Sequence, residues 1–504
     1  MTDRYVLGHD VGTSGNKTVL CDLSGAIVAS AYEAYPLRRP KSNWVEQDPD
    51  ALISALARGS RSVLELADVP PGEVLGIGVS GQMFNVLAVD GRGNALTPLL
   101  SWLDMRSVKQ ANEISARLDF DAQFDRFGNV FTAKDIVPKV LWIRDAAPDI
   151  WRRSAAFLDC KDYVNARLTG KRATDHAGAS ATFLFDIERR RWAEDRATEL
   201  GIPVDRLPEA LDATTSLGGL ATQVASEAGL LPGTPVVVAA GDVPAGQIAA
   251  GASRPGEAHL SLGTACYLGL TLDRPRTDPG RRLGVLCHVD PTRWLLWAEM
   301  ETGGGAVAWL RDLLGGAIGS RPMSGTDVDR LAASVSPDKL DLLFAPWLTG
   351  ERVPLWDHDA RGAFVGLRLH HGAGHLARAV IEGIAFQLRW AVEYAEDFGL
   401  DISEIRVIGG AGMGLVLPRV LADVLSRPLA LVVEPQSAGA RGAALCAIAG
   451  IADGEIDRLA ESTGVAERIE PEDRHRPAYE RRFEAFKSLH AALEGPMRSL
   501  IGDQ

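Results

Sequence analysis

The fold class is indicated by a stretch near the start of the chain that reads Tyr5-Val-Leu-Gly-His-Asp10-Val-Gly-Thr-Ser-Gly15-Asn-Lys-Thr-Val-Leu-Cys-Asp22. Residues 5–10 are typical of a buried strand, and residues 17–22 are typical of a strand that returns beside it. Residues 11–15, rich in Gly, Thr and Ser, form the turn between them, and residues 26–31 continue as a third strand. The pattern predicts a β-meander whose first turn can contact a ligand.

A similar pattern recurs about 250 residues later, where Ala258-His-Leu-Ser-Leu-Gly-Thr264 and residues 266–272 again give an apolar strand, a Gly-Thr turn and an apolar strand. The two copies share the order of their elements more than their letters, so we interpret them as a weak internal duplication. Ser253-Arg-Pro-Gly256 is typical of a linker. We therefore predict an α/β fold with two domains, residues 1–253 and 254–504, on either side of a central cleft.

Hydrophobic periodicity predicts the elements between these hairpins. A short apolar strand is expected at residues 74–79, another at 235–240, and a third at 405–408. Helices are expected at residues 49–67, through most of 107–215, at 244–252, at 374–398, and in the C-terminal segment, where Tyr479, Phe483, Phe486, Leu489 and Leu493 form a stripe. We interpret that stripe as packing against the body of the protein.

Composition excludes several classes of protein. The 504 residues carry 53 basic and 66 acidic side chains, a net charge of −13, which argues against a general binder of nucleic acid or anionic membranes. The five cysteines form no CxxC pair, so neither a disulfide framework nor a zinc site is expected. The start shows no signal-peptide pattern, and no uncharged apolar run reaches the roughly 18 residues that a membrane span needs. We expect a cytoplasmic protein.

The first turn has the composition of a phosphate-binding loop. Thr13 and Ser14 offer hydroxyl and backbone N–H groups, and Lys17 follows them. Asp10 ends the preceding strand and could hold Mg²⁺ directly or through water. The alternative is a plain hairpin turn beside a surface lysine. No Walker loop spacing is present here.

Asp242 follows an apolar strand and precedes a helix with Pro244 near its first turn. Open α/β sheets bind ligands at the carboxyl ends of their strands. The neighbouring residues are small, so a substrate could approach the carboxylate, which could accept a proton from a hydroxyl. A helix cap worth about 1 kcal/mol is the equal alternative.

Two further groups of residues are candidates for ligand contact. Gly410 and Gly412 lie in a glycine-rich turn between a strand and a helix, where a nucleotide could approach, but a Rossmann fingerprint would need a third glycine at Leu415. Polar and aromatic side chains of the kind that bind sugars follow two predicted strands, and the alternative is a loop with one half-buried tryptophan. They are Gln82, Trp102, Asp104 and Arg106.

Taken in order, these segments resemble the FGGY carbohydrate kinases of the actin/Hsp70/hexokinase-like superfamily, nearest to the xylulokinase-like branch. The most specific match is Gly362-Ala-Phe-Val-Gly-Leu367 followed after seven residues by His375-Leu-Ala-Arg-Ala-Val-Ile-Glu382. The resemblance covers nearly the whole chain. The other matching pieces are Asp10-Val-Gly-Thr-Ser-Gly15 with Lys17, Trp44-Val-Glu-Gln-Asp48, Gly81-Gln-Met83, Trp102 with Asp104 and Arg106, Lys161-Asp-Tyr163, Gly241-Asp242, Ser261-Leu-Gly-Thr264, Gly350-Glu-Arg352 and Gly409-Gly-Ala411.

The resemblance implies ATP-dependent phosphorylation of a sugar or polyol hydroxyl between two ribonuclease-H-like domains, the first binding the sugar and the second the nucleotide. It makes Asp242 the catalytic base and Asp10 the Mg²⁺-side carboxylate. It implies that the nucleotide is bound by Thr13, Ser14, Lys17, Gly263, Thr264, Gly303, Gly304, Gly410, Ala411, Gly412 and Met413. It places the sugar against Gln82, Met83, Phe84, Trp102, Asp104, Arg106 and Asp242.

The chain departs from the xylulokinase pattern on the sugar side. Phe84 replaces the usual His after Gly-Gln-Met, Val243 replaces the usual Asn after the catalytic Asp, and Lys134 and Ile136 fall where small or hydroxyl residues are usual. A ketopentose such as xylulose is the first expected substrate. Other ketoses or polyols, such as ribulose, erythritol or a deoxy-xylulose, are alternatives, and an actin- or Hsp70-like ATPase without a small acceptor is a further one. No nucleic-acid or membrane partner is expected, and a homodimer is compatible with the sequence.

Overall fold

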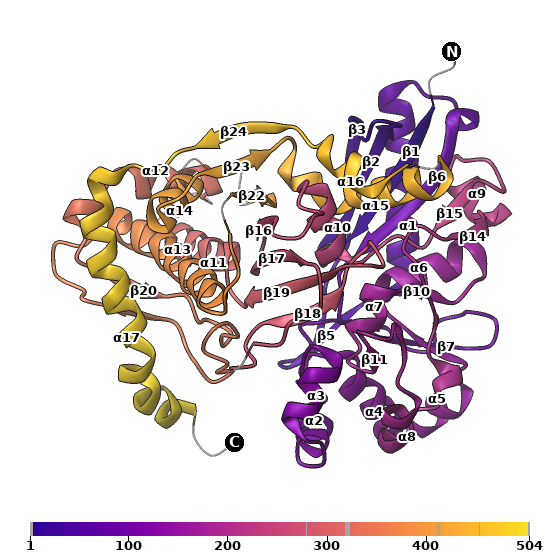
Figure 1. The fold of residues 1–504 in the computed structure, drawn as a ribbon, viewed down its shortest axis with the longest axis horizontal. Coiled ribbons are helices and arrows are strands. Elements are labelled where there is room, and N and C mark those ends of the chain that lie inside the picture. Colours follow the sequence, from indigo (N-terminus) through magenta and orange to yellow (C-terminus); the bar gives the residue numbers. More distant parts are fainter. Residues whose placement is uncertain are drawn as a thin grey trace.

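The computed structural model describes residues 4–501 except 279, 318–322, 403, 411–413, 415 and 453. Within this part the chain forms two α/β halves, each built on one large sheet (Figure 1). The first sheet consists of β14 (Ser216–Gly219), β15 (Pro235–Val237), β6 (Val74–Gly81), β1 (Tyr5–Val11), β2 (Gly15–Asp22) and β3 (Ile27–Ala34), in that order. The second consists of β18 (Gly284–Cys287), β19 (Trp294–Met300), β17 (Cys266–Leu272), β16 (Ala258–Leu262), β22 (Ile405–Ile408), β23 (Leu429–Val432) and β24 (Val465–Ile469).

The two sheets repeat one topology. β1 pairs antiparallel with β2 and parallel with β6, and β16 pairs antiparallel with β17 and parallel with β22. Each sheet ends in an antiparallel edge strand, β14 or β24, beside a parallel one. The duplication expected from the two Gly-Thr hairpins is therefore present in the order and direction of the strands.

Helices surround both sheets. In the N-terminal half they are α1 (Pro49–Ala67), α2 (Val108–Ser115), α3 (Phe120–Phe127), α4 (Ile136–Ala146), α5 (Pro148–Arg153), α6 (Cys160–Thr169), α7 (His176–Ser180), α8 (Glu194–Leu200), α9 (Thr222–Ala228) and α10 (Asp242–Ala249). In the C-terminal half they are α11 (Gly304–Ala317), α12 (Gly325–Ala333), α13 (Ala373–Asp397), α14 (Leu417–Leu425), α15 (Ala438–Ile451), α16 (Ile456–Glu461) and α17 (Arg476–Ile501). Among the described helices, none combines the length and the apolar character needed to cross a bilayer.

Short strand pairs complete the fold. They are β4 (Arg38–Lys41), β5 (Trp44–Gln47) and β8 (Leu99–Leu100) in one sheet, and the pairs β7 (Leu87–Val89) with β9 (Ala156–Leu158), β10 (Ala173–Asp175) with β13 (Glu209–Leu211), β11 (Phe185–Asp186) with β12 (Arg191–Trp192), and β20 (Leu343–Ala345) with β21 (Ala363–Val365).

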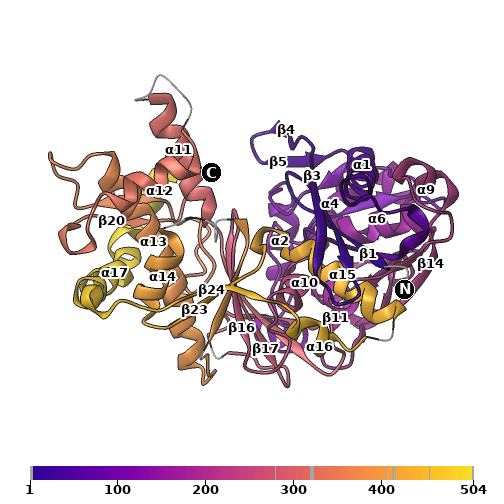
Figure 2. The ribbon, with the colours of Figure 1, turned by 90° about the horizontal axis from the view of Figure 1, so that it is seen from above.

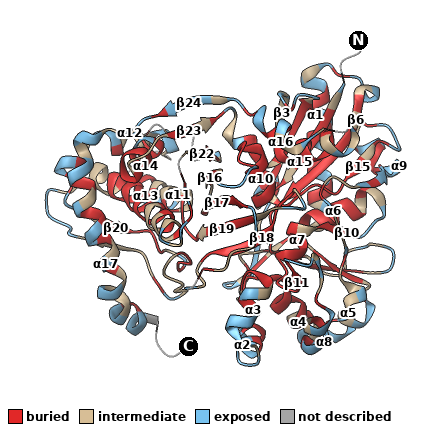
Figure 3. Ribbon diagram, viewed as in Figure 1, coloured by how far each residue is buried: buried red, intermediate tan, exposed pale blue. Residues whose placement is uncertain are grey.

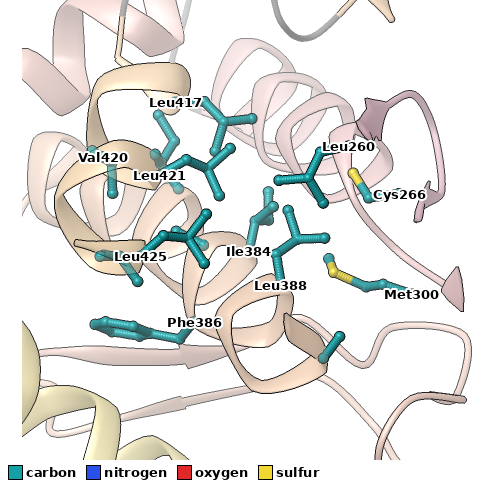
Figure 4. Close-up of a cluster of buried hydrophobic side chains, with 14 of the residues drawn as sticks. Leu260, Cys266, Met300, Ile384, Phe386, Leu388, Leu417, Val420, Leu421 and Leu425 are labelled. Atoms are coloured by element: carbon teal, nitrogen blue, oxygen red, sulfur yellow. The ribbon is translucent and has the colours of Figure 1, made fainter. Parts of the chain in front are cut away.

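The C-terminal half has its own apolar core between its sheet and helices α13 and α14. Leu260, Ile384 and Leu421 meet there, and the buried faces of α13 and α14 are directed toward one another (Figure 4). Tyr479 and Phe483 of α17 pack against this core, which confirms the interpretation of the C-terminal stripe. Buried residues line the facing sides of sheets and helices, whereas exposed residues gather on the outer turns (Figure 3).

Helix α15 connects the halves, because it belongs to the later part of the chain but packs on the first sheet. It lies beside β1 and β6 in Figure 1, and beside β1 again in Figure 2. Val6 and Val237 of the first sheet share one buried cluster with Ala443 of α15 and Ile248 of α10. The two domains expected on either side of residue 253 therefore share part of their core.

The strand expected at residues 235–240 is shorter than its apolar run, because β15 ends at Val237. Ala239 has a φ of +51°, a left-handed conformation that turns the chain out of the sheet. Helix α10 then begins at Asp242, two residues earlier than expected. The correction places Asp242 inside the first helical turn.

We predict that Gly78→Ala destabilises the protein, because a Cβ at Gly78 would overlap the carbonyl oxygen of Ala443 in α15. Forcing an extra methyl into a packed core typically costs about 1–3 kcal/mol. Urea unfolding should show a lower midpoint for this variant. Gly91→Ala is the matched control, since a Cβ there would have no neighbour within 4 Å. Equal midpoints for the two variants would contradict the prediction.

Candidate active site

A cavity of about 200 Å³ lies between the two halves and takes residues from both. From the first half it is lined by Thr13, Met83, Phe84, Trp102, Asp242 and Val243. From the second half it is lined by Ser261, Gly263, Thr264, Ala265, Tyr267, Trp297 and Glu299.

Strand direction explains why these residues converge. β1, β6 and β15 run parallel, so the segments after them leave the same edge of the first sheet. These segments carry Thr13, Met83 and Asp242. In the second sheet, β16 and β22 are parallel, and Gly263 and Gly410 follow them at one edge. Ligands of open α/β sheets bind at such carboxyl ends, so the fold itself brings the two edges to one cavity.

Asp242 is the first residue of α10, and it also lines the cavity. Its Oδ1 accepts a hydrogen bond from the Val243 N–H at 2.9 Å, which holds the carboxylate at the first turn of α10. Among the described residues, no hydrogen bond to Oδ2 is found. The alternative of a helix cap at Asp242 is wrong, because Gly241 is the N-cap residue of α10 and Asp242 is the first residue of the helix. One carboxylate oxygen is bound by the Val243 N–H, and the other is left for a substrate.

Burial raises the pKa of Asp242 well above its ordinary value, and the negative charges of Asp10, Asp159 and Glu299 raise it further. A carboxylate with a raised pKa is a stronger base once it is deprotonated. Such a perturbed group in a cleft is typical of a catalytic site.

Asp10 lies at the end of β1, opposite Lys17 of β2. Its Oδ1 is buried and has no hydrogen-bond partner in the described parts of the chain. A Cβ at Gly439, in the first turn of α15, would overlap its Oδ2. Burial raises the pKa of Asp10 to about 6, and the charge of Lys17 acts in the opposite direction. An unpartnered carboxylate oxygen suits Mg²⁺, which prefers oxygen ligands.

The turn after β1 is held in shape by side chains from other strands. The Gly12 N–H donates to the Gly15 carbonyl at 3.0 Å, and Gln47 Nε2 donates to the Thr13 carbonyl at 2.8 Å. Thr13 Oγ1 accepts from Trp102 Nε1 at 3.0 Å. Ser14 is exposed, next to the turn. The turn therefore presents Thr13 to the cavity in a fixed position.

The glycines expected to contact nucleotide lie next to the matching turn of the second half. The N–H of Gly303 donates to the Thr264 carbonyl at 2.8 Å, and the N–H of Gly304 donates to the Gly263 carbonyl at 2.8 Å. These two N–H groups thus hold the turn and leave Thr264 exposed on it. Gly410 is exposed after β22. Ala411, Gly412 and Met413 lie outside the described residues.

The polar-aromatic set expected to bind sugar separates into two parts. Trp102 lines the cavity. Asp104 and Arg106 lie behind it as a buried ion pair, with Arg106 Nη2 2.7 Å from both Asp104 Oδ2 and Glu46 Oε1. The sequence analysis assigned Trp102, Asp104 and Arg106 alike to sugar binding, because an ion pair and a sugar contact use the same residue types.

Gln82 is only 3% exposed and is part of the same support. Its Nε2 donates to the Gly12 carbonyl at 3.3 Å, and its Oε1 accepts from Thr13 Oγ1 at 3.3 Å. Its polar atoms therefore join the segment after β6 to the turn after β1.

Met83 and Phe84 give the cavity an apolar wall. Phe84 has a φ of +65°, an uncommon conformation for a bulky residue, and its carbonyl accepts from Lys139 Nζ at 2.9 Å. Its ring stacks on Trp297 of the second half at a centroid distance of 5.4 Å and an angle of 21°. Phe84, which stands where the xylulokinase pattern has His, thus forms an apolar contact between the two domains.

Sequence reasoning missed three cavity residues that lie on strands of the second sheet, namely Tyr267, Trp297 and Glu299. Tyr267 and Glu299 are cross-strand partners on β17 and β19, and both line the cavity. The available signal was the acidic residue inside the apolar strand Trp294–Met300. Trp297, also missed, was hidden because an aromatic residue in a strand is typical of core.

We predict that Asp242→Asn stabilises the ligand-free protein, and more so at higher pH. The folded-state pKa of Asp242 lies above its unfolded value, so its cost to folding is absent below about pH 4, grows as pH rises from there, and levels off once pH exceeds the folded pKa. Asn carries no charge at any pH. Thermal unfolding at pH 5, 6.5 and 8 should show a Tm difference between variant and wild type that increases with pH.

The exposed Asp205, in the same half, supplies the control, because Asp205→Asn removes a charge that is not buried. Its Tm difference from wild type should stay constant. A difference for Asp242→Asn that stays flat or falls with pH would show that the charge of Asp242 is not buried at a cost.

Comparisons with known proteins agree with this geometry. The N-terminal domain of the FGGY family of carbohydrate kinases matches residues 5–249, and the C-terminal domain matches residues 258–451. The gluconokinase of Bacillus subtilis strain 168 is 28% identical over 480 residues, 94% of this chain and 92% of its own length. The xylulose kinase of Escherichia coli K12 is 28% identical over 488 residues, 97% of this chain and 99% of its own.

Solved structures show the same likeness. A ligand-bound xylulose kinase from Lactobacillus acidophilus superposes with a TM-score of 0.89 at 25% identity, covering 99% of this chain and all of its own. A gluconate kinase from the same organism gives 0.88 at 25% identity and 98% of both chains. Matches to both family domains, over more than half of the chain, establish that this protein belongs to the FGGY family of carbohydrate kinases and has their two-domain fold and ATP-dependent sugar kinase activity.

Proposed function

We propose that this kinase phosphorylates an uncharged ketose or polyol, with a ketopentose such as xylulose as the first candidate, and that Asp242 is its general base. In this scheme residues 1–253 bind the sugar and residues 254–504 bind the nucleotide. The observation that carries the proposal is the presence of Asp242, Thr13 and Thr264 on one cavity, with no hydrogen-bond partner for Asp242 Oδ2 among the residues that the structure describes.

The reaction follows from these positions. Asp242 accepts the proton of the acceptor hydroxyl as its oxygen attacks the γ-phosphorus, and ADP leaves. The turns that carry Thr13 and Thr264 approach the phosphates from opposite halves, and their fixed hydrogen bonds reduce the reorganisation needed on binding. Asp10 would hold Mg²⁺, which supplies charge neutralisation for the phosphates when it is bound.

The charge of the cavity favours a neutral substrate over a sugar acid. Asp242 and Glu299 are acidic, and the described residues that line the cavity include no Lys, Arg or His. The relatives include both xylulose kinases and gluconokinases. Xylulose is uncharged and gluconate carries a carboxylate, so the charge of the cavity bears directly on the choice between these two substrates. A carboxylate substrate would need a cation at the site.

The apolar wall at Phe84 also bears on the substrate. It offers no hydrogen bond to a sugar, which favours an acceptor with a less polar end, such as a deoxy-ketose. The alternative of an actin- or Hsp70-like ATPase without a small acceptor is disfavoured by the family membership, and ADP release distinguishes it directly.

We predict that uncharged ketopentoses or polyols stimulate ADP release and that gluconate does so weakly. The measurement is steady-state ADP formation at fixed ATP with xylulose, ribulose, erythritol, 1-deoxy-xylulose and gluconate. With the best acceptor, Asp242→Asn should lower kcat by about 10²–10⁴-fold, because proton removal is lost. Sugar affinity should change little.

Asp205→Asn serves again as the control and should keep wild-type turnover. Near-normal turnover of Asp242→Asn would remove Asp242 from the role of base. Stimulation of the wild type by none of the four uncharged acceptors, or stronger stimulation by gluconate than by any of them, would overturn the proposal of a ketose or polyol kinase.

We predict that Thr264→Ala raises the KM for ATP while the KM for the acceptor stays near wild type, since Thr264 is exposed on the second turn. Thr13→Ala should raise both KM values, because Thr13 Oγ1 also holds the indole of Trp102. Steady-state kinetics with each substrate varied in turn checks both. If Thr264→Ala changed only the acceptor KM, the assignment of this turn to phosphate would be wrong.

A further inference from the structure

Glu299 is a carboxylate of the second half that the mechanism above does not use. It lies on β19 next to Tyr267 of β17, and both side chains line the cavity that also contains Asp242. The carboxyl groups of Glu299 and Asp242 therefore belong to the same cavity, from opposite halves of the protein.

A chain of buried charges holds Glu299 in place. Arg352 Nη1 lies 3.3 Å from Glu299 Oε2, and Arg352 Nε lies 2.7 Å from Glu301 Oε1. Lys134, from the first half, places its Nζ 2.5 Å from Glu301 Oε2. Glu301 is thus bonded by two cations from different domains, and Arg352 is left to bridge Glu301 and Glu299.

The remaining oxygen of Glu299 is open. Within the described parts of the chain, Oε1 forms no hydrogen bond, and the side chain keeps 14% of its surface exposed. A residue that served only as the counter-ion of Arg352 would not be needed, because Glu301 already fills that role at 2.7 Å. A carboxylate held at one oxygen and open at the other is suited to accept a hydrogen bond from a hydroxyl.

We propose that Glu299, as an exception within the half assigned to the nucleotide, binds a second hydroxyl of the acceptor and makes the site selective for uncharged polyhydroxy substrates over sugar acids. The inference rests on the proposed function, because it assigns the substrate class of the same cavity. Asp242 then activates the hydroxyl that is phosphorylated, and Glu299 orients the molecule through another one. In their ionised forms, the two carboxylates together repel a carboxylate on the substrate.

The test uses Glu299→Gln, which keeps the shape and removes the charge, and Glu299→Ala, which also removes the hydrogen bond. Kinetics are measured on the full chain with xylulose, or the best uncharged acceptor of the panel, and with gluconate. Hydrogen bonds to charged groups are strong enough that Glu299→Ala should raise the acceptor KM by about 10-fold or more. The KM for ATP should stay within about 2-fold, a split that a general loss of structure would not produce.

Glu299→Gln should also reduce the preference for the uncharged acceptor over gluconate, because repulsion of the acid is weaker. Glu467→Gln is the matched control: it removes the same charge from the exposed face of β24, an edge strand of the same sheet. That variant should keep both the acceptor KM and the preference of the wild type.

The outcomes separate this inference from the proposed function. A wild type stimulated by no acceptor defeats the proposed function itself. An active wild type that prefers an uncharged acceptor, but whose acceptor KM and preference are unchanged in both Glu299 variants, overturns the role of Glu299 alone. A wild type that prefers gluconate overturns the proposed function as well. If Glu299→Ala does not fold, the preference ratio of Glu299→Gln decides.

Discussion

The contact on which the rest of the structure depends is the close approach of α15 to the first sheet. A Cβ at Gly8 of β1 would overlap the carbonyl oxygen of Ala440, and a Cβ at Gly442 would overlap that of Ala245 in α10. Backbones this close leave no room for side chains, so the spacing of the first sheet, α15 and α10 is set by the main chain itself. Where elements are packed this densely, the position of one element fixes the positions of its neighbours.

The same contact fixes the positions of two candidate site carboxylates, Asp10 and Asp242, as well as the position of the core. The first turn of α15 touches Asp10 through Gly439, and α10, which carries Asp242 at its start, packs on the same helix. Two carboxylates from separate strands are therefore held at fixed positions relative to the second sheet. Preorganised groups of this kind stabilise charge in a transition state without having to move first.

Negative charge is buried in the cavity, at Asp242 and Glu299, and also at Asp10 outside its lining, at a cost to folding. Burial raises the pKa values of Asp10, Asp242 and Glu299, so ionising each of these carboxyl groups costs more free energy than it would in water. Evolved active sites commonly accept such a cost because function requires it. The cations near Glu299 belong to a network that joins the two domains, which makes the environment of the cavity dependent on their arrangement.

Local signals in the sequence were enough to predict the two Gly-Thr hairpins and the long helix over residues 374–398, because alternation of apolar residues and turn chemistry are local properties. They also marked Asp242 as a candidate, with its role left open. The sequence could not separate Trp102, which reaches the cavity, from Asp104 and Arg106, which support it, since both roles use the same polar residue types. It also missed Glu299. Only the tertiary structure decided which side chains face the cavity, because that depends on strands far apart in sequence being brought to one edge.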